Sequence, residues 1–282
     1  THGYHKQYEC LLFSRLKITG YATNFGGLTS HAAIVARSLN VPAVVGLHEA
    51  TENIKNDDTL IIDGFNGIVV VNPDEEQVEF YKKKLVKLYE VDSELAKLKD
   101  LPAVTLDGKR IGMLGNLDMS DELDLIIQNG SEGVGLMRTE QVFHENDSFP
   151  SELEQAKVYT NFATKLYPRP LTIRAFDIGG DKVLPVDVKE PNPMLGWRGI
   201  RFLLDNRSLF KSQIRAVLRA STNNNVKFMI PMVSSFKELM LTKELMEECK
   251  NELKAEKIKF DDLMEIGIRI EVPSAALMIT DL

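Results

Sequence analysis

Residues 26–37 read GGLTSHAAIVAR: two glycines, two hydroxyl residues and a histidine lie close together. Because glycine adopts backbone angles closed to other residues, Gly26 and Gly27 predict a tight turn. Thr29 and Ser30 are favoured N-cap residues, so a helix is predicted to begin directly after them. The stretch therefore predicts a turn followed by a helix whose first turn carries the histidine.

His31 is the first candidate for chemistry, in a helix predicted over residues 31–39 and ended by Asn40 and the Val41-Pro42 pair. At the start of a helix, free backbone N–H groups and the positive dipole end favour an anion. A histidine that carries a phosphoryl group needs this setting, with a ring nitrogen as nucleophile and nearby hydroxyls to hold phosphate oxygens. The alternative is a histidine that only helps to cap the helix; the glycine and hydroxyl pairs before it favour the phosphoryl carrier.

The composition excludes several classes of protein. The chain has 282 residues, enough for two domains, with 44% hydrophobic and 27% charged residues. A net charge of −7 argues against non-specific nucleic-acid binding, and an anionic substrate would need a local arginine cluster. Cys10 and Cys249 lie far apart without metal-type spacing, which fits a reducing compartment, so we expect a cytoplasmic protein. No apolar run approaches the ~20 residues of a membrane span.

The first part of the chain predicts a small α/β unit that ends near residue 73. Strands are predicted over residues 17–24, 43–47, 59–63 and 68–72, the last two joined by a glycine-containing hairpin turn. Residues 74–100 contain no glycine or proline and carry apolar residues at helical spacing. They predict one helix of ~40 Å, either a surface helix packed on one domain or a spacer between two. Its position between two differently patterned regions favours the spacer.

The remainder alternates strand and helix. Strands are predicted near residues 110–114, 133–137, 171–175, 227–232 and 265–270. Ser151 to Glu154 form a capping box that opens a helix to residue 167, and residues 236–257 form another helix, which carries Cys249. Repeated βα units of this size predict a TIM-type (β/α)8 barrel. Only five of its eight strands are predicted, so the barrel is expected to be incomplete.

Charged residues end three of these strands. Arg138 follows one strand, Arg174 and Asp177 end the next, and Glu271 ends the last. Such residues are costly on apolar strands unless they face a site or a partner. Arginine binds phosphate and carboxylate bidentately, and a carboxylate can hold Mg²⁺, so the set suits a phosphorylated carboxylic acid. The alternative is a set of ion pairs at the barrel rim.

Five segments carry a resemblance to a known family. Residues 26–46 resemble the phosphohistidine segment of the phosphoenolpyruvate-utilising enzymes. Four more resemble enzyme I of the sugar phosphotransferase system, a phosphoenolpyruvate-protein phosphotransferase: GLMRTE at 135–140, RAFDIGGDK at 174–182, NPMLGWRGIR at 192–201 and EVPSA at 271–275. The DIGGDK segment separates this family from the dikinases and synthases.

The resemblance implies roles for individual residues. It makes His31 the phosphoryl acceptor, Arg138 and Arg174 the ligands of the phosphoenolpyruvate phosphate, and Glu271 a Mg²⁺ ligand. It assigns Lys182, Arg198 and Arg201 to shaping the site, with salt bridging as an equal alternative. It also implies a small histidine-containing phosphocarrier protein as partner, and we expect a homodimer in the intact enzyme.

The expected domains are an N-terminally incomplete phosphohistidine domain at 1–73, a linker helix at 74–100, and a C-terminally incomplete phosphoenolpyruvate-binding barrel at 101–282. The family's second metal ligand, its proton-donating cysteine and its carrier-docking domain have no counterpart in the sequence. We therefore expect a fragment of the enzyme that is inactive alone. The alternatives are a phosphoenolpyruvate synthase or pyruvate phosphate dikinase, and a non-catalytic phosphorelay or regulatory module.

Overall fold

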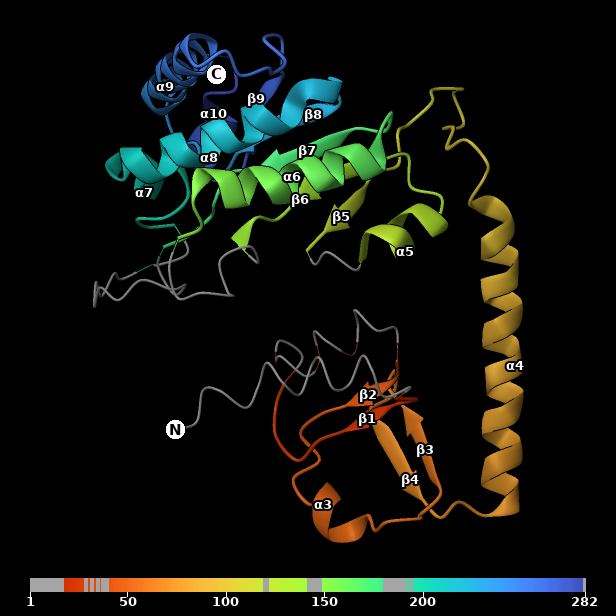
Figure 1. The fold of residues 1–282 in the computed structure, drawn as a ribbon. Helices are drawn as coiled ribbons and strands as arrows, with labels where there is room; N and C mark the ends of the chain where they lie inside the picture. Colours follow the sequence, from red (N-terminus) through yellow and green to blue (C-terminus); the bar gives the residue numbers. More distant parts are fainter. Residues whose placement is uncertain are drawn as a thin grey trace. The chain divides into compact units, whose positions relative to one another are not determined.

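The computed structural model describes residues 18–27, 30, 33, 36, 41–118, 122–140, 149–179, 192 and 195–280 (Figure 1). The chain divides into two compact units, unit 1 at Thr1–Leu98 and unit 2 at Lys99–Leu282. His31 and Lys182 lie outside the described residues. None of the helices in the described ranges combines the length and apolar composition needed to cross a lipid bilayer.

Unit 1 contains two small sheets. β1 (Tyr21–Ala22) pairs in parallel with β2 (Ala43–Val44), and the short helix α3 (Ala50–Asn53) follows. β3 (Leu60–Asp63) and β4 (Ile68–Val71) pair antiparallel as a hairpin. The four strands predicted for this part of the chain are confirmed, each over a shorter range.

The hairpin turn is held by a buried carboxylate. One oxygen of Asp63 accepts hydrogen bonds from the backbone N–H groups of Phe65 (3.2 Å) and Asn66 (3.1 Å). The other accepts one from the Asn66 side-chain amide at 2.8 Å. Gly67 closes the turn with φ +68°, a conformation that glycine adopts without steric cost. The side chain that ends β3 therefore also fixes the turn that follows.

The predicted long helix is confirmed as α4 (Glu75–Leu98). The Asp74 carboxylate accepts a hydrogen bond from the Gln77 N–H at 2.8 Å, and the Gln77 side chain accepts one from the Asp74 N–H at 3.1 Å, so the start of the helix is capped reciprocally. Lys84 donates to Asp63 at 2.5 Å and ties the helix to the hairpin. None of its residues is buried; its role as a spacer stays a prediction.

Unit 2 is built on a five-stranded parallel sheet whose strands follow one another in chain order. The strands are β5 (Gly115–Leu117), β6 (Val134–Met137), β7 (Leu171–Arg174), β8 (Val226–Ile230) and β9 (Ile266–Ile268). Parallel strands need a long crossover between them, and helices supply most of it here. This confirms a mixed α/β fold with a parallel sheet.

The helices of unit 2 are α5 (Glu122–Gln128), α6 (Glu152–Leu166), α7 (Ile200–Asp205), α8 (Arg207–Ala220), the 3-10 turn η2 (Ser221–Asn223), α9 (Phe236–Ala255) and α10 (Pro273–Leu277). The capping box predicted at Ser151 and Glu154 is present at the start of α6, and Ser235 and Glu238 form a second one on α9. α8 packs against both α6 and α9 in one helical layer (Figure 1).

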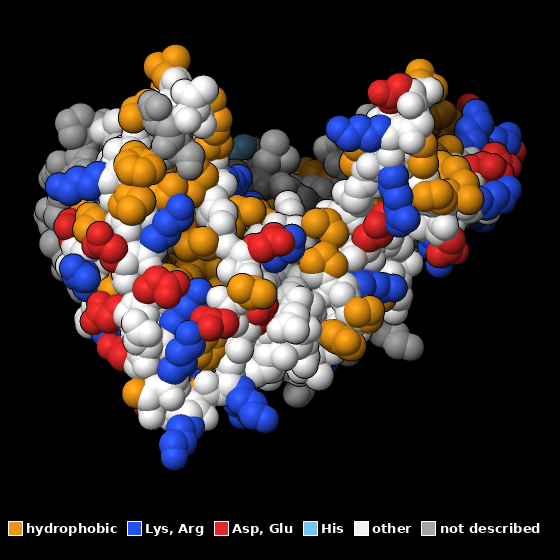
Figure 2. All heavy atoms as spheres, turned by 90° about the horizontal axis from the view of Figure 1, so that it is seen from above, with side chains coloured by type: hydrophobic (Ala, Val, Ile, Leu, Met, Phe, Trp, Pro, Cys, Tyr) orange, Lys and Arg blue, Asp and Glu red, His pale blue; other side chains and the backbone are white. Residues whose placement is uncertain are grey.

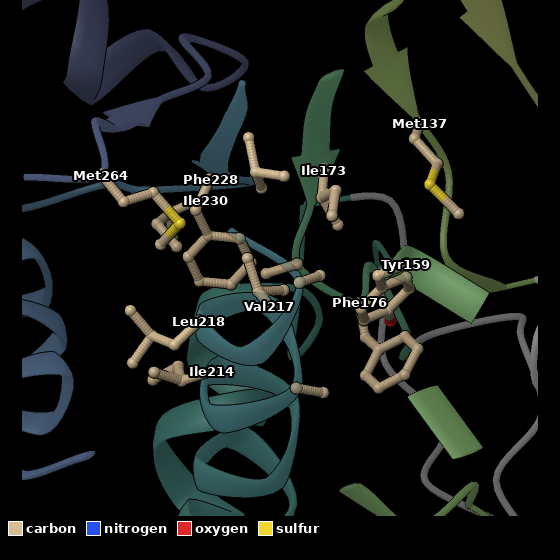
Figure 3. Close-up of a cluster of buried hydrophobic side chains, with 14 of the residues drawn as sticks. Met137, Tyr159, Ile173, Phe176, Ile214, Val217, Leu218, Phe228, Ile230 and Met264 are labelled. Carbon is tan, nitrogen blue, oxygen red and sulfur yellow. The ribbon is translucent and has the colours of Figure 1, made fainter. Parts of the chain in front are cut away.

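The core of unit 2 lies between this helical layer and the sheet. Figure 3 shows side chains of α8 beside those of β7 and β8; the labelled members from these elements are Ile214, Val217, Leu218, Ile173, Phe228 and Ile230, all at most 1% exposed. Burying each such side chain stabilises the fold by about 1.5–3 kcal/mol. Cys249 lies in the same core as a free thiol, and burial raises its pKa to about 12.

The strand predicted at residues 110–114 is wrong. The first residue of that range forms an isolated antiparallel bridge with Val104, and the sheet begins at β5 (Gly115–Leu117). A Cβ on Gly115 would come within 2.5 Å of a methyl group of Ile126 on α5, so the strand forms where a missing side chain allows close packing. Tertiary packing selects this glycine-started segment over the more apolar residues before it.

Candidate functional site

Unit 2 gathers charged and polar side chains where its parallel strands end, at an edge that we call the carboxyl edge. Because all five strands run in one direction, these ends lie on the same side of the sheet. The residues at or just beyond the ends are Asp118 after β5, Arg138, Thr139 and Glu140 after β6, Arg174 and Asp177 at β7, and Glu271 after β9. In open and closed α/β sheets, ligands bind at this edge.

Arg174 is a buried charge of the carboxyl edge, with 5% of its surface exposed. Its Nη2 donates to Oε1 of Glu140 at 2.7 Å, and its Nη1 lies 3.3 Å from Oδ2 of Asp177. Its Nε is buried without a hydrogen-bond partner among the described residues. Two carboxylates thus orient the guanidinium fork.

A second buried arginine completes this group. Arg198 donates to both oxygens of Asp177, from Nε at 2.9 Å and from Nη2 at 2.8 Å. The backbone brings it there through a bridge to Gly179, which lies at φ +133° and whose Cβ would clash with the Trp197 carbonyl at 2.1 Å. We call Glu140, Arg174, Asp177 and Arg198 the edge cluster; its two positive and two negative charges balance, as buried ions require.

Arg138 lies beside the edge cluster but is half-exposed. Its Nη1 donates to Oδ2 of Asp118 at 2.8 Å, and its backbone N–H bonds to the Leu117 carbonyl across the β5–β6 pair. The other oxygen of Asp118 is buried and has no hydrogen-bond partner in the described part of the chain. The Arg138 guanidinium is therefore in contact with water at the edge, and one carboxylate, that of Asp118, binds it.

Glu271 is fixed beyond β9 by two contacts. One carboxylate oxygen accepts the Met232 N–H at 3.0 Å, and the other lies 3.1 Å from Nε of Arg269. Met232 in turn packs against Gly199, where an added Cβ would lie 2.9 Å from the methionine Cβ and 3.3 Å from an oxygen of Asp177. A continuous set of contacts thus joins Glu271 to the edge cluster.

The described residues contain no group of three or more His, Cys, Asp and Glu side chains placed to hold a metal ion together. Glu271 still offers carboxylate oxygens at the edge, the type of ligand that Mg²⁺ prefers. Mg²⁺ is commonly held by one or two carboxylates together with substrate oxygens. The residues present therefore fit a metal that the substrate helps to bind.

Arg201 binds backbone carbonyls of a neighbouring loop. Its Nη1 donates to the Gly196 carbonyl at 2.5 Å and to the Leu195 carbonyl, so it fastens the loop that carries Arg198. For Arg201 this contact fits the expected site-shaping role. For Arg198 the ion pair with Asp177 fits the other predicted role, salt bridging.

Part of the segment at residues 26–37 is described, and Gly26, Ser30 and Ala33 are the informative positions. Gly26 has φ +121°, so the tight turn uses the conformational freedom of glycine. Ser30 accepts a hydrogen bond from the Ala33 N–H at 3.4 Å through its side chain, as an N-cap residue does. The helix predicted over residues 31–39 lies mostly outside the described residues.

Sequence reasoning missed three residues that the structure places near Arg138 or Arg174. Glu140 belongs to the quoted GLMRTE segment, but only the fold shows that it receives the Arg174 fork. Asp118 was hidden by the misplaced first strand; a strand at 115–117 would have marked it as a polar residue at a strand end. Gln213, on α8, had no signal, because its contacts come from distant parts of the chain.

Two family models match the chain. The model described as "PEP-utilising enzyme, PEP-binding domain" matches residues 92–282, and that described as "PEP-utilising enzyme, mobile domain" matches residues 8–67. Phosphoenolpyruvate-protein phosphotransferases of Haemophilus influenzae and Mycoplasma capricolum are 43% and 41% identical to the chain; each alignment covers 93% of the chain and 46% of the relative. The chain thus spans about half the length of these curated relatives.

A solution NMR structure of enzyme I is 57% identical over 26% of this chain and 29% of that one; its TM-score of 0.24 is too low to bear on the fold. The domain match over residues 92–282 covers more than half of the sequence. By that match, the chain belongs to the family of phosphoenolpyruvate-utilising enzymes.

Proposed function

We propose that this chain is the part of a phosphoenolpyruvate-protein phosphotransferase that moves a phosphoryl group from phosphoenolpyruvate to His31. From His31 the group passes to a small histidine-containing carrier protein. The observation that carries the proposal is the carboxyl edge, where the forks of Arg138 and Arg174 end neighbouring strands and Glu271 lies on the same side. The proposal includes the cytoplasmic location and the homodimeric intact enzyme expected from the sequence.

Arg174 and Arg138 have complementary roles toward the substrate phosphate. Arg174 is preoriented by Glu140 and Asp177, and among the described residues its Nε–H has no hydrogen-bond partner. Arg138 is half-exposed and exchanges Asp118 for a phosphate oxygen. Preoriented donors in a site shielded from water stabilise developing charge without reorganisation, which is the main requirement of phosphoryl transfer.

Glu271 would hold Mg²⁺ together with substrate oxygens. Bound there, the ion would neutralise phosphate and carboxylate charge. The Arg269 guanidinium, 3.1 Å from the same carboxylate, balances its charge when no metal is bound. The N–H of Met232 keeps one carboxylate oxygen in a fixed orientation.

In the transfer step, an imidazole nitrogen of His31 forms a bond to phosphorus. The bond between phosphorus and the enol oxygen breaks, and the enolate takes up a proton at carbon to become pyruvate. The N-cap contact of Ser30 with the Ala33 N–H supports this role, because a helix N-terminus stabilises the negative charge of a phosphoryl group.

The proposed domain organisation follows from the same reaction. Residues 1–73 form a phosphohistidine domain that swivels between donor and acceptor, and residues 74–100 form the linker. Residues 101–282 form part of a (β/α)8 barrel that binds phosphoenolpyruvate. The sequential parallel order from β5 to β9, with helices between the strands, supports the barrel.

The test is to incubate the full-length natural protein that carries this sequence with phosphoenolpyruvate and Mg²⁺, and to map the phosphate by mass spectrometry. We expect an acid-labile, base-stable phosphate on His31 and none in His31→Gln. His48→Asn is the matched control, because His48 is exposed at φ +61°, which asparagine tolerates. Phosphate on His2, His5, His48 or His144 in place of His31 would contradict the proposal.

A second arm separates this reaction from the dikinase and synthase alternatives. We expect pyruvate release with the carrier protein as acceptor and without any nucleotide. A strict requirement for a nucleotide would favour a dikinase or synthase, and phosphorylation without pyruvate turnover would favour a regulatory module.

A further inference from the structure

A glutamine in the core of unit 2 makes three hydrogen bonds close to the end of β7. Gln213, on α8, is completely buried. Its Oε1 accepts the backbone N–H of Phe176 at 3.0 Å, and its Nε2 donates to the Thr139 hydroxyl at 3.2 Å and to the Tyr159 hydroxyl at 3.3 Å. A side chain of the helical layer thereby binds the backbone at the carboxyl edge.

Thr139 extends this contact to Arg174. The hydroxyl of Thr139, also completely buried, donates to the Arg174 carbonyl at 3.0 Å while it accepts from Gln213. Gln213 therefore holds the chain on both sides of Ala175, through the carbonyl before it and the amide after it. The Ala175 N–H itself bonds to Met229 of β8 at 2.8 Å.

The guanidinium of Arg174 is aligned from the same strand end. Glu140, the neighbour of Thr139, accepts from Arg174 Nη2 at 2.7 Å and from the Asp177 N–H at 2.8 Å through one oxygen. A displacement of the backbone at residues 174–177 would therefore move the fork and its partner carboxylates relative to each other.

Further hydrogen bonds hold the side chain of Gln213 through Tyr159. The hydroxyl of Tyr159 donates to Gln155 at 3.2 Å, and the Gln155 amide donates to the Pro150 carbonyl at 2.9 Å. Burial raises the pKa of Tyr159, so its hydroxyl keeps its proton. Figure 3 draws Tyr159 and Phe176 in this part of the core. The hydroxyl can then donate in one direction only, which leaves its oxygen to accept from Gln213.

We propose that Gln213 is a positioning residue that fixes the Arg174 backbone for binding of the phosphoenolpyruvate phosphate. This inference rests on the proposed function, because it assumes that Arg174 contacts the substrate. A buried polar network is expensive to build and is rigid once every member is satisfied, whereas apolar side chains could fill the same volume. Small displacements of a binding group are costly in phosphoryl transfer, since the reaction depends on geometry.

The test uses Gln213→Met in the full-length natural protein, because methionine keeps the length of the side chain and removes its hydrogen bonds. We expect KM for phosphoenolpyruvate to rise about tenfold. Transfer from an already phosphorylated His31 to the carrier protein should keep its wild-type rate, since that step does not use Arg174. A purely structural role would not separate these two steps.

Further variants test whether lost stability alone explains the effect and whether the Thr139 hydroxyl is needed. Asn225 is also buried and donates to the carbonyls of Ala163 and Arg169, but it precedes β8 at the opposite edge. Asn225→Leu should lower the melting temperature comparably and leave KM unchanged. Thr139→Ser should retain the wild-type KM, and Thr139→Val should raise it as Gln213→Met does.

The outcomes separate the two levels of inference. If Arg174→Lys raises KM for phosphoenolpyruvate but Gln213→Met leaves it unchanged, the positioning role is wrong and the proposed function stands. If Arg174→Lys also leaves KM unchanged, the phosphate-binding assignment itself is wrong. If Asn225→Leu raises KM as strongly as Gln213→Met, general destabilisation explains the effect and the positioning role is overturned.

Discussion

Unit 2 contains two groups of ionised side chains that differ in their access to water. The edge cluster has four members, and the side chains of Arg174, Asp177 and Arg198 are each at most 7% exposed. The second group, which we call the outer network, joins helices α6, α8 and α9 and consists of Lys211, Arg215, Arg219, Glu152, Glu248, Glu252 and Glu256. Its side chains are 11–48% exposed.

The difference shows what each group can do. In the outer network Arg215 contacts three carboxylates, at 2.6, 3.0 and 2.8 Å, and water can replace any one of them. On the face drawn in Figure 2, basic and acidic side chains likewise lie next to one another in solvent. The edge cluster has no such substitute, so its charges must balance and its geometry is fixed. Fixed geometry suits substrate binding, whereas redundancy suits stability.

The largest effect is expected at the centre of the edge cluster. Arg174→Ala should lower kcat/KM for phosphoenolpyruvate at least ~100-fold, because it removes a preoriented donor. It should also destabilise unit 2 by about 3–5 kcal/mol, since Asp177 and Glu140 lose a buried partner. Arg174→Lys should keep the fold but recover activity only in part, because lysine lacks the fork. Steady-state kinetics and urea unfolding measure both; a fully active alanine variant would refute the assignment.

A smaller and more selective loss is expected for Arg138→Ala. Each charge-assisted hydrogen bond contributes roughly 1.5–3 kcal/mol, so kcat/KM should fall about 10–100-fold. Stability should change by less than about 1 kcal/mol, because the ion pair with Asp118 is half-exposed. Calorimetric titration with phosphoenolpyruvate and thermal unfolding give the two values. Equal stability losses for Arg138→Ala and Arg174→Ala would erase the contrast between the two arginines.

The outer network should affect stability without affecting substrate binding. Burial opposes ionisation of Glu152, but hydrogen bonds from Arg215 and Arg219 outweigh it and lower its pKa. Because the folded pKa is depressed, this stabilisation is present above about pH 4.5 and is lost as pH falls through the folded value. Glu152→Gln should cost about 1–2 kcal/mol at pH 7 and flatten this acid dependence in urea titrations. An altered KM in this variant would show that the network reaches the site.

The smallest effect on substrate binding is expected in unit 1, where the prediction concerns stability alone. A hydrogen bond from Lys84, assisted by those from Asn66, lowers the pKa of Asp63 from 3.8 to about 2 although burial opposes it. The stabilisation is therefore present above pH 4 and lost between about pH 4 and pH 2. Asp63→Asn should remove that dependence and cost roughly 2–3 kcal/mol at neutral pH. Thermal unfolding as a function of pH measures it, with exposed Asp57 changed to Asn as control.

Local signals in the sequence predicted the elements well where one short segment contains the whole cause. The hairpin of β3 and β4 forms around a turn whose donors lie within three residues of Asp63. The capping box of α6 needs only Ser151 and Glu154. The first strand of unit 2 was misplaced; it begins at Gly115, which packs closely on Ile126 of α5, and no local pattern contains that contact.

The sequence by itself determined which residue types stand at the ends of the parallel strands, and hence that Arg138, Arg174 and Glu271 share one edge of the sheet. Strand direction and period suffice for that conclusion. Only the tertiary structure decided that Arg174 is buried in a neutral cluster while Arg138 stays half-exposed, and that Gln213 bonds to Thr139 and to the Phe176 N–H. The contact of Arg174 with Glu140 spans 34 residues of chain and that of Gln213 with Thr139 spans 74, and packing rather than local preference determines such contacts.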